Sequence, residues 1–177
     1  CIESINRLEM DDIEIIIIND CSTDDTYQVC CNLERSFKQI KVIDNSENMG
    51  PGACRMLGLT EADGKYVFFL DSDDQLLSEF TEVYRYIRDH EHTCDGYLFG
   101  YVENREDGTK IYRKLFEEAV EFSGMEFLEK VFPQMDMQAM WQFVYSKEYL
   151  LRFHVTCPAE MKVNEDYMFN MQVYSFA

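Results

Sequence analysis

The order of apolar and polar residues predicts that helices and strands alternate along the first part of the chain. Apolar residues recur at helical spacing in residues 1–9, and residues 13–18 form a short apolar run rich in β-branched side chains, which is typical of a buried parallel strand. Strands separated by helices favour a parallel sheet with right-handed crossovers. Further along, we expect a helix that runs from the capping residues 22–24 to about 37, a strand at 40–43, a helix at 51–62 and a strand at 66–70.

The second part of the chain has a less regular pattern. Alternating aromatic residues at Trp141, Phe143 and Tyr145 indicate a strand-like segment in the core rather than a platform for a sugar. We predict one α/β domain in which residues 1–94 and 95–177 form two halves. The remaining expected elements are helices at 76–90, 124–132 and 147–153 and from 165 onward, and a hairpin of 96–102 with 110–114 across the Glu-Asp-Gly turn signal at 106–108.

Size and charge limit the possible functions. A chain of 177 residues is long enough for one domain with a core and short for two. Its 34 acidic and 16 basic residues give a net charge of −18, which repels DNA, RNA and anionic lipid, so we expect no nucleic-acid partner. An anionic substrate would need a cation in order to enter an acidic pocket.

The cysteines and the apolar runs indicate the cellular compartment in which we expect the protein. The seven cysteines are odd in number and include no Cys-x-x-Cys pair, so we expect reduced cysteines in a cytosolic protein. No apolar run approaches the roughly 18 residues of a membrane span, and no signal peptide is visible. Because a helical pattern begins at the first residue, we also expect a segment upstream of it.

Three carboxylates, Asp71, Asp73 and Asp74, directly follow the predicted strand at 66–70. Ligands bind at the carboxyl ends of parallel strands, and clustered carboxylates repel one another unless a cation joins them. Oxygen ligands of this kind suit Mg²⁺ or Mn²⁺, which bridge protein carboxylates and substrate phosphates. The sequence therefore predicts a metal site here; the alternative is a set of helix-capping acids in solvent.

Asp20 and Arg55 are two further candidate binding residues. Asp20 comes at the end of the strand formed by residues 15–19 and should face the same crevice as Asp71, because parallel strands end on the same side. Its carboxylate could accept a hydrogen bond from a ligand or cap the following loop. Arg55 follows a Gly-rich loop at 48–52 and could bind a phosphate in bidentate geometry or form a surface salt bridge.

Glu165 and Asp166 open the last predicted helix. Acidic residues in a first helical turn are common because they complement the helix dipole, so this pair is ambiguous by itself. Successive helical residues point about 100° apart, so we expect only one of the two to face the crevice.

Four segments resemble, in order and at plausible spacing, the motifs of family 2 glycosyltransferases of the GT-A fold. Residues 14–26 and 48–58 resemble the strand-plus-loop signature and the Gly-rich segment of that family. Residues 64–74 look like the strand that delivers its DXD motif, and residues 165–166 look like its later ED motif. Residues 95–160 resemble the family only loosely, as expected of its variable acceptor region.

The resemblance implies a role for each matching residue. Asp20 would bind the nucleotide base, commonly uracil, and Arg55 would lie near the nucleotide. Asp71 would approach the ribose or the metal, and Asp73 would ligate the Mg²⁺ or Mn²⁺ that holds the diphosphate. Asp166 would be the general base that deprotonates the acceptor hydroxyl. The implied fold is a Rossmann-like, mostly parallel sheet with flanking helices.

The implied activity is that of an inverting glycosyltransferase. It would move a sugar from a nucleotide-diphosphate donor, expected to be a UDP-sugar, to a hydroxyl of a saccharide or lipid-linked acceptor. A single inline displacement inverts the anomeric centre and needs one base. Such enzymes often build surface polysaccharides, so we expect a cytoplasmic protein or one attached peripherally to the inner face of the membrane.

The sequence departs from the family pattern in two places. Asn19 and Cys21 flank Asp20, where the family usually has Asp and Gly. The family's first strand, which also lines the base pocket, should lie before residue 1. We therefore expect the position beside the strand at 13–18 to be unfilled by residues 1–177.

Other classes share part of this pattern. A receiver domain also places acids at parallel strand ends, but it should have a late Lys at a strand end, and none is evident. A nucleotidyltransferase would show a Gly-rich loop with a basic residue near its start, which this chain does not include. A non-catalytic nucleotide-sugar-binding fragment is the alternative outside enzymes, and turnover by the complete gene product would exclude it.

Overall fold

The computed structural model describes residues 1–8, 10–114, 116, 118–135, 139–158 and 164–177. Its first part contains α1 (Ile2–Asn6), β1 (Ile15–Asn19), α2 (Thr26–Ser36), β2 (Ile40–Asp44), α3 (Pro51–Glu61), β3 (Tyr66–Phe68) and α4 (Phe80–Asp89). Its second part contains β4 (Gly96–Leu98), β5 (Tyr101–Asn104), β6 (Lys110–Arg113), α5 (Gly124–Lys130), β7 (Phe143–Ser146), α6 (Lys147–Arg152) and α7 (Glu165–Phe176), with the short 3₁₀ helices η1 (Phe132–Gln134) and η2 (Met140–Gln142).

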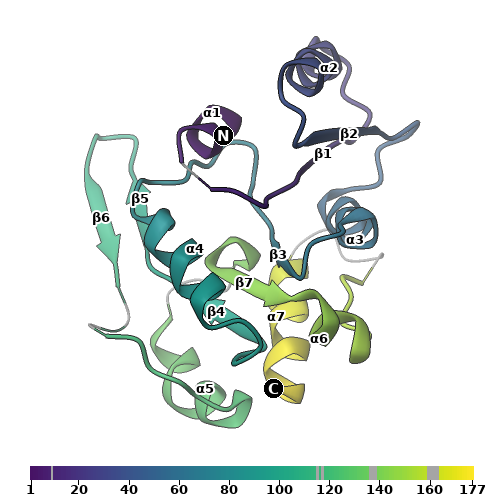
Figure 1. Ribbon diagram of the computed structural model, residues 1–177. Helices are drawn as coiled ribbons and strands as arrows, with labels where there is room; N and C mark the ends of the chain where they lie inside the picture. The colour runs from purple at the N-terminus through teal and green to yellow at the C-terminus, as the bar shows by residue number, and fades with distance from the viewer. Residues whose placement is uncertain (9, 115, 117, 136–138, 159–163) are drawn as a thin grey trace.

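The strands form three groups rather than one mostly parallel sheet (Figure 1). β1 and β2 are parallel, as predicted. β7 lies between β3 and β4 and runs antiparallel to both, and β5 pairs with β6 in an antiparallel hairpin. The α/β class is confirmed, but the expectation of a mostly parallel sheet is wrong for the described strands. The reason is that β3 takes a strand of the second half as its hydrogen-bonded neighbour.

The alternating pattern of β7 explains its central position. Phe143 and Tyr145 point into the main core, whose buried residues include Phe169 of α7. Val144, between them, points to the opposite face and joins a second cluster with Ile87 of α4. A strand whose two faces both carry apolar side chains is buried on both sides, so β7 lies inside the β3–β7–β4 sheet. The prediction of core residues is confirmed for Phe143 and Tyr145. Trp141 is only partly buried and lies in η2 rather than in the strand.

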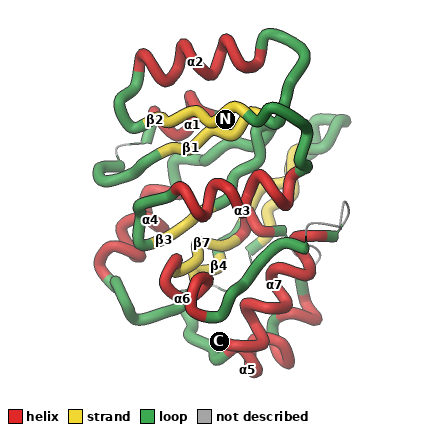
Figure 2. The backbone as a smooth tube through the Cα atoms, turned by 90° about the vertical axis from the view of Figure 1, so that its right-hand side faces the viewer, coloured by secondary structure: helices red, strands yellow, loops and turns green. Residues whose placement is uncertain are grey.

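β1 pairs with β2, and no other strand is recorded beside it among the described residues. The expected first strand before residue 1 stays a prediction. α3 crosses in front of the strands, with the β1–β2 pair above it and α6 and α7 below (Figure 2). This helix therefore lies between the β1–β2 pair and the β3–β7–β4 sheet. The predicted site residues meet at its amino end.

One predicted hairpin strand is divided between two sheets. The expected strand at 96–102 ends after Leu98, and the chain resumes as β5 at Tyr101. Gly100 lies in the break, where a Cβ atom would come 2.5 Å from the carbonyl oxygen of Arg113. Only glycine allows β6 to approach this closely, so the first piece joins β7 and the second joins β6.

The cysteines and the helices add two observations. All seven cysteines are free of disulfides. Within the described ranges, none of the helices combines the length and apolar composition that crossing a bilayer requires.

Candidate functional site

Asp20 joins the carboxyl end of β1 to the loop that leads into α3. Its Oδ1 accepts hydrogen bonds from Met49 N at 2.8 Å and from Asn45 Nδ2 at 3.0 Å, and its Oδ2 accepts one from Gly50 N at 2.8 Å. Gly50 has a φ of 83° and is the N-cap of α3. The Asp20 carboxylate therefore holds the first turn of α3 in place.

These hydrogen bonds set the protonation of Asp20. Burial by itself would raise the pKa of this carboxyl, but the N–H donors of Met49, Asn45 and Gly50 outweigh it, so the pKa lies below its usual value. The thiol of Cys54 lies near Asp20, and its Sγ accepts a hydrogen bond from the same Asn45 Nδ2 at 3.5 Å. Its burial, followed by the neighbouring Asp20 carboxylate, raises the pKa of Cys54 to about 11, so this cysteine stays a neutral thiol.

Arg55, one turn further along α3, is the centre of an ionic cluster that we call the Arg55 cluster: Arg55, Asp71, Glu165 and Asp166. Its Nη2 lies 2.9 Å from Asp71 Oδ1. Its Nη1 lies 2.9 Å from Glu165 Oε1 and 2.7 Å from Asp166 Oδ1. The Arg55 side chain is 14% exposed. One guanidinium therefore faces three carboxylates, a cluster with an excess of negative charge that is partly shielded from water.

Gly52 allows this cluster to form. A Cβ atom at position 52 would lie 3.1 Å from Cys157 Cβ and 3.7 Å from Glu165 Cγ. The absence of a side chain lets α3 approach the start of α7, which carries two of the three carboxylates. The sequence showed this glycine only as part of a Gly-rich loop.

Asp166 is the most constrained carboxylate of the Arg55 cluster. While Oδ1 contacts Arg55, Oδ2 accepts a hydrogen bond from Met140 N at 3.1 Å. Burial raises the pKa of Asp166 above its usual value, and the Met140 N–H and the Arg55 charge oppose that rise only in part. A carboxylate with a raised pKa is a stronger base than an exposed one, which suits proton abstraction.

The Asp71–Asp74 segment forms a turn after β3. Asp74 N donates to the Asp71 carbonyl oxygen at 3.1 Å. Burial, followed by the negative charges of Asp71 and Asp73, raises the pKa of Asp74. Asp73 is exposed and lies outside the Arg55 cluster. Within the described part of the chain, no group of three or more Asp, Glu, His or Cys side chains is already arranged around a common metal position.

The structure thus brings four of the five predicted site residues to the start of α3: Asp20, Arg55, Asp71 and Asp166. Asp73 extends into solvent instead. The expectation that only one of Glu165 and Asp166 faces the crevice is wrong, because both contact the same Arg55 nitrogen. The first turn of α7 lies close enough to α3 for the successive side chains of Glu165 and Asp166 to reach the Arg55 guanidinium. The Met140 N–H is a participant that sequence reasoning missed, and the contact of Glu165 with Arg55 was not expected.

Comparison with known proteins establishes the family of the chain. The model of the family "Glycosyl transferase family 2" matches residues 1–150. The chain therefore belongs to the family 2 glycosyltransferases, as the sequence motifs indicated.

Individual relatives extend the similarity over the whole chain. EpsH of Bacillus subtilis is 27% identical over 180 residues, which cover 100% of this chain and 52% of EpsH. The GalNAc(5)-diNAcBac-PP-undecaprenol beta-1,3-glucosyltransferase of Campylobacter jejuni is 42% identical over 78 residues, 44% of this chain and 25% of that protein. The chain thus spans about half or less of the length of these relatives.

A solved structure shares the fold. The crystal structure of S. aureus TarS 1–349 superposes with a TM-score of 0.78 at 26% identity, covering 98% of this chain and 50% of that one. The same TarS fragment in complex with UDP-GlcNAc gives a TM-score of 0.79 at 24% identity.

Proposed function

We propose that this chain forms the donor-binding and catalytic part of an inverting glycosyltransferase, which transfers a sugar from a UDP-sugar to a hydroxyl of a saccharide or lipid-linked acceptor. The observation that carries the proposal is the Arg55 cluster, since it joins Asp71 of the DXD segment to Asp166 of the ED segment through one guanidinium. Membership of family 2 and the likeness to TarS, which was solved with UDP-GlcNAc, support the donor class. The undecaprenol-linked substrate in the name of the Campylobacter jejuni relative supports a lipid-linked acceptor.

The residues at the site suit the individual steps of such a transfer. An acceptor hydroxyl is a poor nucleophile, so a positioned carboxylate must take its proton, and Asp166 has the raised pKa for this role. Asp20, which contacts the N-cap of α3, and Arg55, which lies on α3, would bind the nucleotide. Arg55 would also offset the negative charge of a diphosphate as it enters.

The carboxylates after β3 fit a divalent cation. Asp71 and Asp73 supply oxygen donors of the kind that Mg²⁺ and Mn²⁺ prefer. Burial raises the pKa of the neighbouring Asp74, and the negative charges of Asp71 and Asp73 raise it further. Asp73 and Asp71 would hold the ion, which would offset the charge of the leaving diphosphate. A cation would also offset the charge of Asp71, which pairs with Arg55 in the described part of the chain.

A thermal-shift measurement with UDP tests the donor and metal parts of the proposal. UDP or a UDP-sugar should stabilise the protein only when Mg²⁺ or Mn²⁺ is present, by about 2.7 kcal/mol at 100 times the dissociation constant. Asp73→Ala should abolish the metal-dependent part. Asp63→Ala, in the turn before β3, is a matched control that removes one nearby acid and should leave it intact. Equal binding of UDP in EDTA would refute the metal role.

A second measurement separates catalysis from binding. The complete protein should release UDP from a UDP-sugar faster when a suitable acceptor is added. Binding of the donor with no turnover under any acceptor condition would favour the non-catalytic nucleotide-sugar-binding fragment instead.

A further inference from the structure

A tyrosine hydroxyl and an asparagine side chain meet inside the main core, one helical turn from Asp166. Tyr145 of β7 and Asn170 of α7 are both 0% exposed, and the Tyr145 hydroxyl donates a hydrogen bond to Asn170 Oδ1 at 2.6 Å. Burial raises the pKa of Tyr145 well above its usual value, so the hydroxyl keeps its proton and acts as a donor. Because a buried polar group without a partner is destabilising, this pair favours one arrangement of β7 and α7 over others.

The packing of the Tyr145 ring does not require its hydroxyl. The ring meets Phe169 edge-on, with centroids 5.4 Å apart, and stacks on Phe143 with centroids 5.7 Å apart. Both neighbours fill the same core as phenylalanines. A phenol at a fully buried position needs a hydrogen-bond partner, whereas a phenylalanine does not, so the hydroxyl at this position indicates a role beyond packing.

Asn170 connects this hydrogen bond to the proposed base through α7. It lies four residues after Asp166, so the two side chains share one side of the helix. At the other end of the bond, Tyr145 belongs to the central strand of a sheet, where it is opposite Val67 of β3 and Gly96 of β4. The hydroxyl therefore ties the first turns of α7 to a strand that is held at both edges.

Met140 connects the same hydroxyl to the base by a second route. Its N–H donates to Asp166 Oδ2 at 3.1 Å, and its carbonyl oxygen lies 3.4 Å from the Tyr145 hydroxyl, a longer contact than the one with Asn170. Met140 is 0% exposed, and the Phe143 N–H also donates to its carbonyl oxygen. The Tyr145 hydroxyl thus lies between α7, which carries the Asp166 carboxylate, and η2, which orients it.

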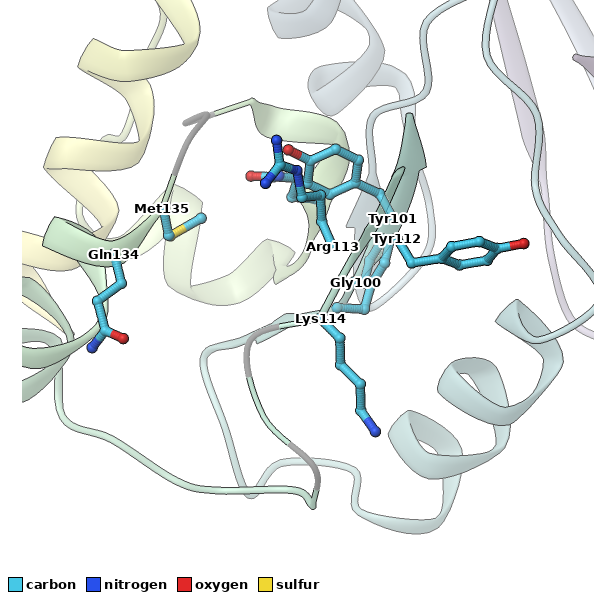
Figure 3. Close-up of a pocket in the computed structure, with 9 residues that line it drawn as sticks. Gly100, Tyr101, Tyr112, Arg113, Lys114, Gln134 and Met135 are labelled. Carbon is cyan, nitrogen blue, oxygen red and sulfur yellow. The ribbon is translucent and has the colours of Figure 1, made fainter. Parts of the chain in front are cut away.

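The far end of η2 faces a different environment. Gln142, its last residue, lines a pocket of about 200 Å³ beside the β5–β6 hairpin (Figure 3). None of the residues to which we assigned a role in the transfer is among the described residues that line this pocket. Within the described part of the chain, the Asp166 carboxylate is therefore held by Arg55 and by the core side of η2, where Tyr145 lies.

We propose that Tyr145 and Asn170 are positioning residues for the transfer, because their hydrogen bond fixes α7 and η2 at the separation that places Asp166 for proton abstraction. Neither residue touches a substrate, since both are fully buried. A displacement of about 1 Å at a reacting group can lower a rate about 10²-fold, so a contact one helical turn from the base affects the chemistry. This inference rests on the proposed glycosyltransferase function and adds two residues that act through Asp166.

Tyr149 of α6 provides a matched control. It is 4% exposed, and its hydroxyl donates to the Val173 carbonyl oxygen of α7 at 2.7 Å. Val173 lies near the end of α7, so this hydrogen bond holds the helix at a distance from the base. Tyr145→Phe and Tyr149→Phe each remove one buried hydroxyl bound to α7, and they should lower the melting temperature by similar amounts.

Release of UDP with water as the acceptor measures the chemical step without a known acceptor. In this reaction water attacks the anomeric carbon, Asp166 takes its proton, and UDP leaves with the electrons of the broken bond. The complete protein is supplied with Mn²⁺ and, in turn, with UDP-glucose, UDP-galactose, UDP-GlcNAc and UDP-GalNAc. The kcat and the donor KM are measured for each donor.

Tyr145→Phe should lower kcat about tenfold to 10²-fold and leave the donor KM within about twofold of the wild-type value. Tyr149→Phe should change neither quantity by more than about twofold. Asn170→Ala removes the acceptor of the same hydrogen bond and should reproduce the fall in kcat, which also provides the test if Tyr145→Phe does not fold.

Three results would overturn the inference and leave the proposed function intact, because the wild-type protein still releases UDP in each case. The first is an equal kcat for Tyr145→Phe and Tyr149→Phe. The second is a raised donor KM at unchanged kcat, which would place Tyr145 in donor binding. The third is loss of folding in both Tyr145→Phe and Asn170→Ala, which would assign the pair to stability alone. Absence of UDP release by the wild-type protein with every donor would instead overturn the proposed function, and this inference with it.

Discussion

Arg55 Nη1 lies 2.7 Å from Asp166 Oδ1, although the two residues are 111 positions apart in the chain. The other nitrogen of the same guanidinium contacts Asp71. Through Arg55, the helix after the Gly-rich loop, the turn after β3 and the start of α7 share one polar centre. Arg55 thus links three segments that lie far apart in the sequence.

Replacing Arg55 should destabilise the protein strongly. Arg55→Ala leaves three partly buried carboxylates without their common cation, and removal of one partner from a buried ion pair typically lowers the free energy of unfolding by about 3–5 kcal/mol. Arg88→Ala is the control, because Arg88 pairs with Asp89 on the exposed surface and should change stability by less than about 1 kcal/mol. Urea unfolding at pH 7 measures both. Equal effects of the two substitutions would show that the Arg55 cluster does not stabilise the fold.

Replacing Asp166 should separate catalysis from binding. Asp166→Asn is nearly isosteric, so donor and metal affinity should stay nearly unchanged. Single-turnover transfer at saturating donor should fall by about 10²–10⁴, the usual contribution of a positioned base. Glu165→Gln removes a charge from the same Arg55 nitrogen and should reduce transfer less, because Glu165 lacks the Met140 contact that orients Asp166. Wild-type rates in Asp166→Asn would remove this residue from the mechanism.

Asp20 should contribute stability that depends on pH. Its pKa is lowered in the folded state, so its contribution is present above the unfolded value of 3.8 and is lost as the pH falls through the lower folded value. Asp20→Asn should therefore be less stable than the wild-type protein at neutral pH, and the difference should shrink below about pH 4. Asp25→Asn is the control, because Asp25 precedes α2 without a capping hydrogen bond. Urea unfolding across this pH range measures both, and a pH-independent difference for Asp20→Asn would contradict the assignment.

Two glycines of α3 should respond to alanine in opposite directions. At Gly52 the new Cβ would lie 3.1 Å from the Cβ of Cys157, so Gly52→Ala must push back the segment around Cys157 and should destabilise the fold by about 1–3 kcal/mol. At Gly58 the nearest atom, Ile18 Cδ1, is 3.4 Å away at the end of a flexible side chain. Gly58→Ala should therefore be neutral or stabilising by up to about 1 kcal/mol through helix propensity. Thermal unfolding measures both variants, and a stabilised Gly52→Ala would refute the close packing of α3 against Cys157.

Most elements of the fold could be predicted from local patterns. The apolar run at 13–18 overlaps β1, Pro51 begins α3 as its fixed φ favours, and Glu165 begins α7. These signals are short-range, because strand and helix periodicity depend on residues only a few positions apart. Strand pairing depends on contacts between distant segments, so the insertion of β7 between β3 and β4 and the division of the expected strand at Gly100 were not predictable.

The sequence by itself determined the family and four of the residues that meet at the candidate site, because the motifs keep their residue types next to strand and helix ends that can be recognised locally. Only the tertiary structure decided how those residues are used. In the structure, Asp20 accepts a hydrogen bond from the loop before α3, and Glu165 contacts Arg55 beside Asp166. Asp73 is exposed to solvent. The physical reason is that the partners of a charged side chain depend on which backbones approach within a few ångströms. Here the missing side chain of Gly52 lets α3 lie close to the start of α7. Arg55 of α3 thereby contacts Asp166, which is 111 positions further along the chain.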